Sequence, residues 1–303
     1  ICCAIGDKKH QAGVERKKEW LKSKFKEGHV FRKLNVRGKI FIEYEPIETA
    51  WVPISGKNYE YIYCLWVAGS FKGKGIAKEL LTYAINDAKQ KGMSGICTLT
   101  SKKKKPFIAE KKFFEHYGFE VVDSIQDYEL LALKFDDSET PRFNDRARLM
   151  KIDHQEFTIY YSNECPYVEY EVKELTEYSK NNDIRINFIK IDSLEKAKNA
   201  PCVFNNWANF YKGAFVSNTI LNANAFEKCE SLESVTILKP DCLISATGNI
   251  EYIKKIYGYP SSTAEKFANE NNIEFIQIEG TPVVYPEYKM GDVYFNHFSY
   301  DVH

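Results

Sequence analysis

Two glycines and two lysines stand directly before a stretch with helical periodicity, in the segment SFKGKGIAKELL at residues 70–81. Glycine at the start of a helix packs nothing and costs backbone entropy, so its presence there indicates another use. A strand that ends in a glycine-rich turn and continues as a helix leaves backbone N–H groups without helical partners, and the helix dipole adds partial positive charge. With Lys72 and Lys74 beside Gly73 and Gly75, the segment predicts a site for a phosphate group.

Three phosphate-binding motifs can be compared with this spacing. A nucleotide-binding P-loop needs one more residue between its two glycines than separates Gly69 from Gly73. It also needs a Ser or Thr after its lysine, and none follows Lys74. The dinucleotide-binding motif needs Gly or Ala where the chain has Lys78. The motif that fits has a basic or amide residue, two residues of any kind, a glycine, one residue of any kind, and then Gly or Ala. It reads KGKGIA at residues 72–77.

This loop and its surroundings resemble the pyrophosphate-binding loop of the GCN5-related N-acetyltransferases, the GNAT family. The strand-like YIYCLWV before the loop, the helix after it and the later KKFFEHYGFEVV stand in that family's order. Within the family the chain is most similar to the YoaP-like acetyltransferases, through ICCAIGDKK at its start, SKKKKPF, and the segment that follows up to about Glu227. The GNAT resemblance covers most of residues 1–136.

The resemblance implies an N-acetyltransferase with acetyl-CoA as co-substrate and an amine of a small molecule or peptide as acceptor. Acetyl-CoA would lie against the splayed end of strand 59–68, and the amine would attack its thioester directly. Strand backbone would pair with the pantetheine amides, and loop N–H groups would hold the pyrophosphate. The residues that the resemblance assigns to acetyl-CoA are Leu65, Trp66, Val67, Lys72, Gly73, Lys74, Gly75, Ile76 and Ala77.

Acetyl transfer also needs a proton for the leaving thiolate. The family's usual donor is a Tyr four residues before the Gly of a Gly-Phe pair, and here that position holds Phe114. A phenyl ring donates no proton. Tyr117 is a neighbouring donor, although on a helix it points in another direction than Phe114. Water is the alternative source of the proton.

The amine needs a base, and the candidates are Glu60, Glu43 and Cys64. The two carboxylates are expected on strands that face the cleft, and the thiol is expected beside the thioester. In the simpler interpretation the carboxylates are solvated and Cys64 is a small buried hydrophobe. We predict Glu60, Cys64 and Tyr117 as the catalytic residues. The lysine run 102–105 either contacts the 3′-phosphate of CoA or is a solvated loop.

Composition is typical of a soluble globular protein. The 303 residues are 44% hydrophobic, which is enough for buried cores, and the formal net charge is zero. Basic residues are in excess in residues 1–136 and acidic residues in the remainder, which favours an anionic ligand for the first part.

The chain has no apolar run near 18 residues and no signal-peptide pattern, so we expect a cytoplasmic protein without membrane contact. The lysine run lacks interleaved aromatics, which argues against nucleic-acid binding. Oligomeric state is not indicated.

The eight cysteines form no CxxC pair, so we predict neither a metal site nor a disulfide framework. They stand at positions 2, 3, 64, 97, 165, 202, 229 and 242.

Hydrophobic periodicity predicts an α/β (α+β) fold for residues 1–136, with a mixed sheet flanked by helices. The first helix, at 8–28, can gather Val14, Trp20, Leu21 and Phe25 on one face. The other expected elements are strands at 29–36, 38–46 and 59–68, a helix at 76–91, a strand at 95–100, a helix at 108–117 and a strand pair at 119–134.

A polar linker is predicted at 137–154, followed by a small α/β domain at 155–228. Its expected elements are a strand at 157–161, a helix at 167–181, a strand at 185–191, a helix at 193–199 and a hairpin in NFYKGAFVS. This domain resembles thioredoxin-like folds, with Pro201 in the place of their cis-proline. Cys165 would stand at a helix N-terminus, which lowers the pKa of a thiol. Val168 replaces the second cysteine of a CxxC motif, which excludes a dithiol cycle there.

Residues 229–280 resemble the end of BspA-like leucine-rich repeats, with one repeat-like turn, a closing helix and a strand. A single repeat cannot bury its own apolar face, so this segment needs a neighbour. Residues 281–303 form a tail without a functional interpretation.

Two other functions stay open at this point. One is a thiol-dependent redox or thiol-binding role that acts through Cys165. The other is a CoA-binding module without turnover, which the phenyl ring of Phe114 would explain.

Overall fold

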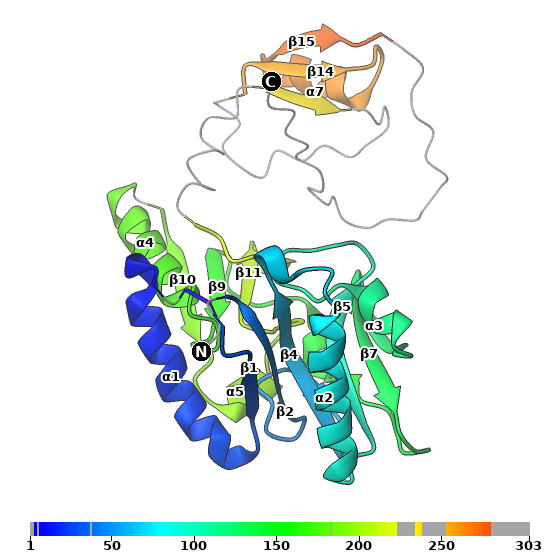
Figure 1. Ribbon diagram of the computed structural model, residues 1–303. Coiled ribbons are helices and arrows are strands. Elements are labelled where there is room, and N and C mark those ends of the chain that lie inside the picture. The colour runs from blue at the N-terminus through cyan, green and yellow to red at the C-terminus, as the bar shows by residue number, and fades with distance from the viewer. Residues whose placement is uncertain are drawn as a thin grey trace. The chain divides into compact units, whose positions relative to one another are not determined.

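The computed structural model describes residues 3–4, 6–36, 38–182, 184–222, 234–237 and 253–279. The chain divides into two compact units, residues 1–223 and 224–303 (Figure 1). The tail predicted at 281–303, together with Cys2, Cys229 and Cys242, lies outside the described residues.

A six-stranded sheet forms the first part of unit 1, with the strand order β1-β2-β4-β5-β7-β6. Its neighbouring strands are antiparallel except β4 and β5, which are parallel. The strands are β1 (Val30–Lys33), β2 (Ile40–Pro46), β4 (Tyr59–Val67), β5 (Gly95–Ser101), β6 (Glu120–Ile125) and β7 (Tyr128–Lys134). The helices are α1 (Gln11–Lys24), α2 (Ile76–Gln90) and α3 (Lys111–His116). The predicted mixed sheet with flanking helices is confirmed.

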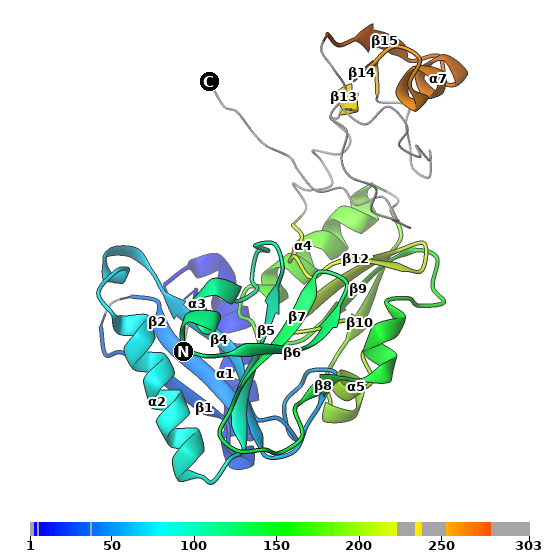
Figure 2. The same cartoon turned by 90° about the vertical axis from the view of Figure 1, so that its right-hand side faces the viewer.

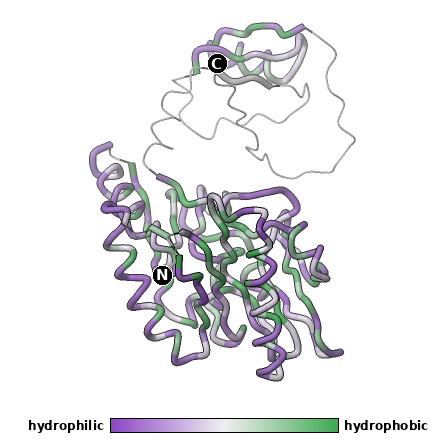
Figure 3. Tube along the Cα trace, in the orientation of Figure 1, coloured by the Kyte–Doolittle hydropathy of each residue, from purple (hydrophilic) through white to green (hydrophobic). Residues whose placement is uncertain are grey.

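Helix α2 follows its sequence pattern closely. Its buried residues are Leu80, Leu81, Ala84 and Ala88, which recur at helical spacing and form one stripe. This stripe and α3 pack on one face of the sheet, around an apolar core that includes Ile62. We call this side of the sheet the α2 face. Figure 3 shows hydrophobic residues along the central strands and mostly hydrophilic ones along α1.

Helix α1 differs from its prediction at the C-terminal end. The helix ends at Lys24, and Phe25 begins the short 3₁₀ helix η2, so its side chain is 51% exposed. The change of helix type rotates Phe25 off the stripe that buries Val14, Trp20 and Leu21. The 3₁₀ helices are η1 (Lys8–His10), η2 (Phe25–Glu27), η3 (Gly69–Phe71) and η4 (Asp145–Leu149).

A second, four-stranded sheet completes unit 1, with the order β10-β9-β11-β12. Its elements are β9 (Phe157–Tyr161), α4 (Val168–Asn181), β10 (Ile186–Lys190), α5 (Leu194–Lys198), β11 (Trp207–Tyr211) and β12 (Ala214–Ser217). The predicted order of strands and helices is confirmed. The peptide bond before Pro201 is trans, so the expected cis-proline is absent from this position. We call residues 155–222 the second domain.

The second domain packs on the face of the first sheet that is opposite to α2 (Figure 2). A single hydrophobic core joins the two sheets, and it contains Tyr61 and Cys97 from the first and Phe204 and Phe210 from the second domain. Helix α4 lies beside α1, where Gly13 approaches the carbonyl oxygen of Pro166 so closely that a Cβ atom would clash. We call this side of the sheet the junction face.

The segment predicted as a linker, 137–154, is packed onto both domains. It contains β8 (Arg142–Phe143), which pairs with β3 (Ile54–Ser55), and the helix η4. Phe143, Ala147 and Met150 are buried in the core at the junction face. These three apolar side chains, spaced through a polar stretch, anchor the segment.

Unit 2 contains a three-stranded parallel sheet in the order β13-β14-β15. Its elements are β13 (Ser234–Ile237), β14 (Lys255–Gly258), α7 (Thr263–Glu270) and β15 (Glu274–Gln277). The Ser262 hydroxyl caps α7, and Ala264 and Ala268 pack with Ile256 in a small core. The BspA-like resemblance stays a prediction. Among the described residues, no helix combines the length and the apolar character that membrane crossing requires.

Candidate active site

The glycine-rich loop leads from η3 into α2. Gly73 and Gly75 have φ values of +74° and +77°, a region that favours glycine, and Gly75 is the N-cap of α2. A Cβ atom added at either glycine would meet no atom within 4 Å, so the loop faces open space. The first bond of the helix runs from Glu79 N–H to Gly75 O at 3.1 Å, so the amides of residues 76–78 precede the helical ladder.

The two central strands separate next to this loop. β4 pairs with β5 only where Tyr59 to Ile62 face Gly95 to Thr98. Beyond that point β4 remains paired only with β2 and β5 only with β7, so the two central strands diverge and a fork opens between β4 and β5. Within the described chain, residues 65–67 therefore have no strand partner on the β5 side. A free strand edge of this kind can hydrogen-bond an extended molecule that carries amides.

A β-bulge lies at the base of the fork. Cys64 pairs with Glu43, but Ile62 pairs with Tyr44, so Tyr63 is an extra residue in β4. Both Tyr63 and Cys64 therefore contact the core at the junction face. Cys64 is half-buried at this position.

Leu65 and Val67 pack on the α2 face, whereas Trp66 is 47% exposed. The predicted acetyl-CoA residues thus form one continuous stretch, from the free edge of β4 through η3 to the start of α2.

Glu60 lies on the α2 face, away from Cys64. Its side chain is fully buried, Oε1 accepts a hydrogen bond from Lys91 Nζ at 3.0 Å, and Oε2 has no partner among the described residues. Burial raises the pKa of Glu60 to about 7, although the Lys91 ammonium opposes this. Lys91 follows the C-terminal end of α2, and a helix of this length spans about 22 Å, so Glu60 is remote from the glycine-rich loop.

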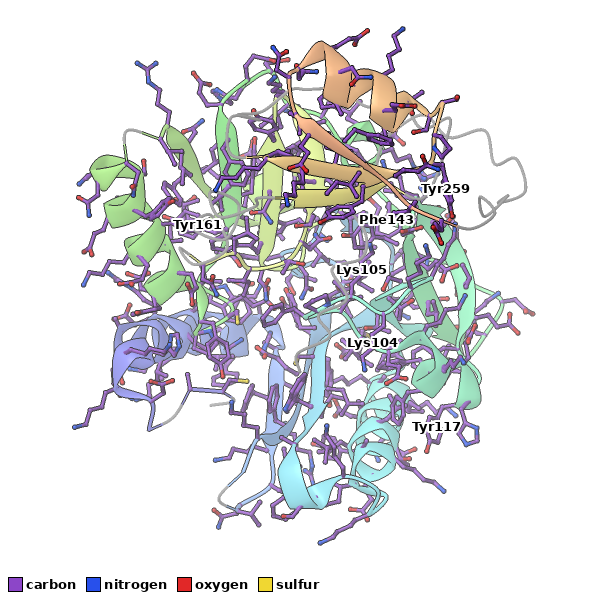
Figure 4. All side chains as sticks on the ribbon, turned by 90° about the horizontal axis from the view of Figure 1, so that it is seen from above. Lys104, Lys105, Tyr117, Phe143, Tyr161 and Tyr259 are labelled. Atoms are coloured by element: carbon purple, nitrogen blue, oxygen red, sulfur yellow. The ribbon has the colours of Figure 1, made fainter. Side chains whose placement is uncertain are left out.

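Phe114 and Tyr117 are both on α3 or at its end. Phe114 is 2% exposed and packs against Phe113 and Phe119 with ring centroids 5.3 and 5.1 Å away. Tyr117 is half-buried, and its ring lies 5.1 Å from that of Phe113. Figure 4 shows Tyr117 on the α2 and α3 side of the molecule, apart from Tyr161 of the second domain. The structure therefore places Glu60 and Cys64 on opposite faces of the sheet, so these two predicted catalytic residues do not act together on one amine.

The lysine run 102–105 lies in the loop after β5. Lys102 donates to Gln126 O at 2.9 Å, and Lys105 lies 3.6 Å from the Asp127 carboxylate. Lys103 and Lys104 are exposed (Figure 4 labels Lys104). The CoA-phosphate and solvated-loop interpretations both remain compatible with this placement.

A set of buried polar side chains at the junction face was largely missed in the sequence. Its members, which we call the charged cluster, are Lys17, Lys24, His29, Glu43, Glu45 and Tyr63. Lys17 donates to Glu43, which also bonds His29 Nε2 at 3.0 Å. Lys24 Nζ lies 2.8 Å from Glu45. A signal was present: Lys17 and Lys24 occupy stripe positions of α1 that apolar residues normally fill.

These pairs fix the ionisation of the charged cluster. Burial opposes ionisation of His29, but its hydrogen bond to Glu43 and the charge of Glu45, 3.6 Å from Nδ1, outweigh this and raise its pKa. Burial likewise opposes ionisation of Glu43, yet Lys17 and His29 lower its pKa. A carboxylate with a lowered pKa is a weak base, so Glu43 is poorly suited to deprotonate an amine.

The second domain adds one more carboxylate here. Glu164 is only 5% exposed, and burial raises its pKa well above the ordinary value, against the effect of Lys17. Burial raises the pKa of Tyr61 and of Tyr63, and the Glu164 carboxylate adds to the effect on both. Cys165 follows Glu164, half-buried, two residues before Tyr167, the N-cap of α4. The described residues contain no group of three or more His, Cys, Asp or Glu arranged for a metal ion.

Two family models match parts of the chain. The acetyltransferase (GNAT) domain model matches residues 37–121, and the YoaP-like model matches residues 185–228. The chain is also 40% identical over 230 residues to a protein of Bacillus subtilis (strain 168) described as "Uncharacterized N-acetyltransferase YoaP". That alignment covers 75% of this chain and 92% of the relative.

Solved structures of acetyltransferases are similar to part of the chain. A putative GNAT acetyltransferase from Desulfovibrio desulfuricans is 20% identical, with a TM-score of 0.32, over 40% of this chain and 77% of its own. The PaiA N-acetyltransferase of Thermoplasma acidophilum, in complex with coenzyme A, is 20% identical, with a TM-score of 0.30, over 39% of this chain and 68% of its own. TM-scores of this size carry no weight in the assignment.

Proposed function

The chain belongs to the family of YoaP, a GNAT-type N-acetyltransferase, and from this membership we propose that it transfers the acetyl group of acetyl-CoA to an amine. The proposed acceptor is an amine of a small molecule or a peptide. In the reaction the amine nitrogen forms a bond to the thioester carbon and gives up one proton to a base. The carbon–sulfur bond breaks, and the CoA thiolate takes up a proton.

One observation supports this proposal most strongly: the open amides of the glycine-rich loop continue directly from the free edge of β4. We propose that N–H groups of residues 73–77 bind the pyrophosphate, where the start of α2 adds partial positive charge. The N–H of Lys72 already donates to Gly69 O at 3.2 Å, so Lys72 would contribute its ammonium group instead. Residues 65–67 would pair with the pantetheine amides. The thioester would then lie near the β-bulge and Cys64.

Roles near the reacting groups are proposed for Cys64 and Tyr117. Cys64 is proposed to border the thioester because it stands at the bulge. Glu60 has a pKa suited to a base at neutral pH, but its carboxylate faces α2 and is held by Lys91.

Tyr117 is proposed as the acid for the thiolate. A Tyr117→Phe variant should then lose at least about 100-fold in kcat, since a positioned proton donor contributes factors of this order. An unchanged kcat would assign that proton to water.

The binding site is tested by calorimetry with acetyl-CoA and with desulpho-CoA. We expect the wild-type chain to bind both, and Gly75→Asp to weaken binding by more than about 100-fold, because a carboxylate would meet the pyrophosphate at close range. Gly92→Asp is the matched control. Gly92 also has a positive φ and open surroundings, but it follows the C-terminal end of α2. Absence of binding by the wild-type chain at millimolar ligand would overturn the proposal.

A further inference from the structure

The acceptor must approach the proposed thioester from the junction face. The α2 face beside β4 is filled by α2, α3 and their apolar core. The β-bulge turns Cys64 toward the opposite side, where the second domain is packed. If acetyl-CoA lies along β4 as proposed above, side chains of the second domain therefore take part in forming the acceptor site.

The segment of the second domain that lies here contains unpaired oxygen atoms. Ser162, Asn163 and Glu164 are consecutive, and each has a buried side-chain oxygen with no hydrogen-bond partner within the described part of the chain. Buried polar atoms are nearly always paired, so three in succession indicate a missing partner. The adjacent Pro166 touches α1 at Gly13, which fixes this segment against the first domain.

Hydrogen-bonding capacity indicates the kind of partner. The nearby lysines are already engaged, Lys17 with Glu43 and Lys24 with Glu45. Burial raises the pKa of Glu164, and the two carboxylates add to this against the effect of the lysines. With His29 protonated, the cations of the charged cluster balance its carboxylates and Glu164, so the partner need not supply an extra charge. A primary amine nitrogen supplies several N–H donors to acceptor oxygens that lie together.

We propose that the acceptor is a compact primary amine that binds between the two domains, with its nitrogen held by Glu164 Oε2 and by the neighbouring oxygens of Asn163 and Ser162. This inference rests on the proposed acetyl transfer. It makes the second domain part of the substrate site, and Glu164 a binding residue that contacts the acceptor. An acceptor with a quaternary nitrogen is excluded, because it has no N–H to donate to these oxygens.

The test is ligand-observed NMR titration of the full chain, saturated with CoA, with methylamine, ethylamine, butylamine and ethylenediamine at millimolar concentration. We expect at least one primary amine to bind and tetramethylammonium not to bind. Glu164→Gln should weaken amine binding at least 10-fold, and Asn163→Ala about 3-fold. Glu171→Gln, a half-buried carboxylate on α4, is the matched control and should bind as the wild type does.

Calorimetry with acetyl-CoA on the same variants separates this inference from the proposed function. Unchanged CoA affinity with lost amine affinity supports the inference, and the Asn163→Ala variant keeps it testable if Glu164→Gln folds poorly. It is overturned if no primary amine binds, if tetramethylammonium binds equally well, or if both variants bind amines as tightly as the wild type. Loss of CoA binding in the wild-type chain would instead defeat the proposed function.

Discussion

The two faces of the six-stranded sheet are held together by different physical means. On the α2 face, apolar side chains such as Leu80, Leu81 and Phe114 surround the strands. On the junction face, the shared core encloses the charged cluster and Glu164. Burial of apolar surface is non-directional, whereas a buried charge depends on its particular partner. The comparison indicates that the α2 face stabilises the first domain alone, and that the junction face requires intact ion pairs and the second domain.

Removal of one charge from the cluster should have the largest effect. Lys17→Met leaves Glu43 buried with only His29 as partner, so we expect the free energy of unfolding to fall by about 3–5 kcal/mol. Urea titration measures this. Lys18→Met is the matched control, since Lys18 pairs with Glu15 on the exposed side of the same helix and should change stability by less than about 0.5 kcal/mol. Equal effects of the two substitutions would remove the distinction between the faces.

The next effect concerns the contact between the domains. Lys198 of α5 donates to the backbone oxygens of Ile47 at 2.6 Å and Ile54 at 2.8 Å in the first domain. Lys198→Met leaves these carbonyls without the ammonium, and we expect a loss of about 2–3 kcal/mol in urea titration at pH 7. Lys196→Met, which removes only an exposed pair with Asp192, is the control. A loss below about 0.5 kcal/mol would show that the apolar core alone joins the domains.

The pH dependence of the same variant gives a second check. Burial lowers the pKa of Lys198 to about 8, from an ordinary value of 10.5. Between these values the unfolded chain binds a proton that the folded chain has lost, so this residue makes wild-type stability rise with pH from about 8 to 10.5. We expect that contribution to be missing in Lys198→Met.

The main features of the α2 face could be predicted from the sequence because the residues that determine them are close together in the chain. The stripe of α2 and the Gly73–Gly75 turn lie within one short segment, and both are present as expected. The junction face could not be predicted in this way. Glu164 and Lys17 are nearly half the chain apart in sequence and come near enough to influence each other only in the folded chain. No local periodicity encodes that proximity. Lysines on an otherwise apolar stripe of α1 were the available signal.

The bulge in β4 also escaped sequence analysis. Alternation along an ideal strand would place Glu60, Ile62 and Cys64 on one face. The extra residue Tyr63 shifts Cys64 to the junction face and leaves Glu60 on the α2 face. No residue type in this strand marks the position of the bulge. The sequence therefore did not predict that Glu60 and Cys64 face opposite sides of the sheet.

Glu60 is a buried carboxyl group on the otherwise apolar α2 face. Its substitution tests how one ionisable group changes the stability of that face. Its pKa of about 7, above the ordinary 4.5, means that the folded chain retains a proton that the unfolded chain loses between these values. Wild-type stability should therefore fall as pH rises from 4.5 to 7, and stay lower above that. Glu60→Gln removes the titration, and we expect its gain over the wild type to be about 2 kcal/mol larger at pH 8 than at pH 5.

Thermal and urea unfolding at the two pH values measure this difference. Glu120→Gln, at an exposed position of β6, is the control that should show no such gain. Acetyl transfer by Glu60→Gln gives the complementary result. Because Glu60 faces α2 and Lys91 retains Asp87 at 2.7 Å as a partner, we expect kcat to stay within about 3-fold of the wild type. A loss of about 100-fold in kcat, with acetyl-CoA affinity unchanged, would instead identify Glu60 as the base and place the reacting amine on the α2 face.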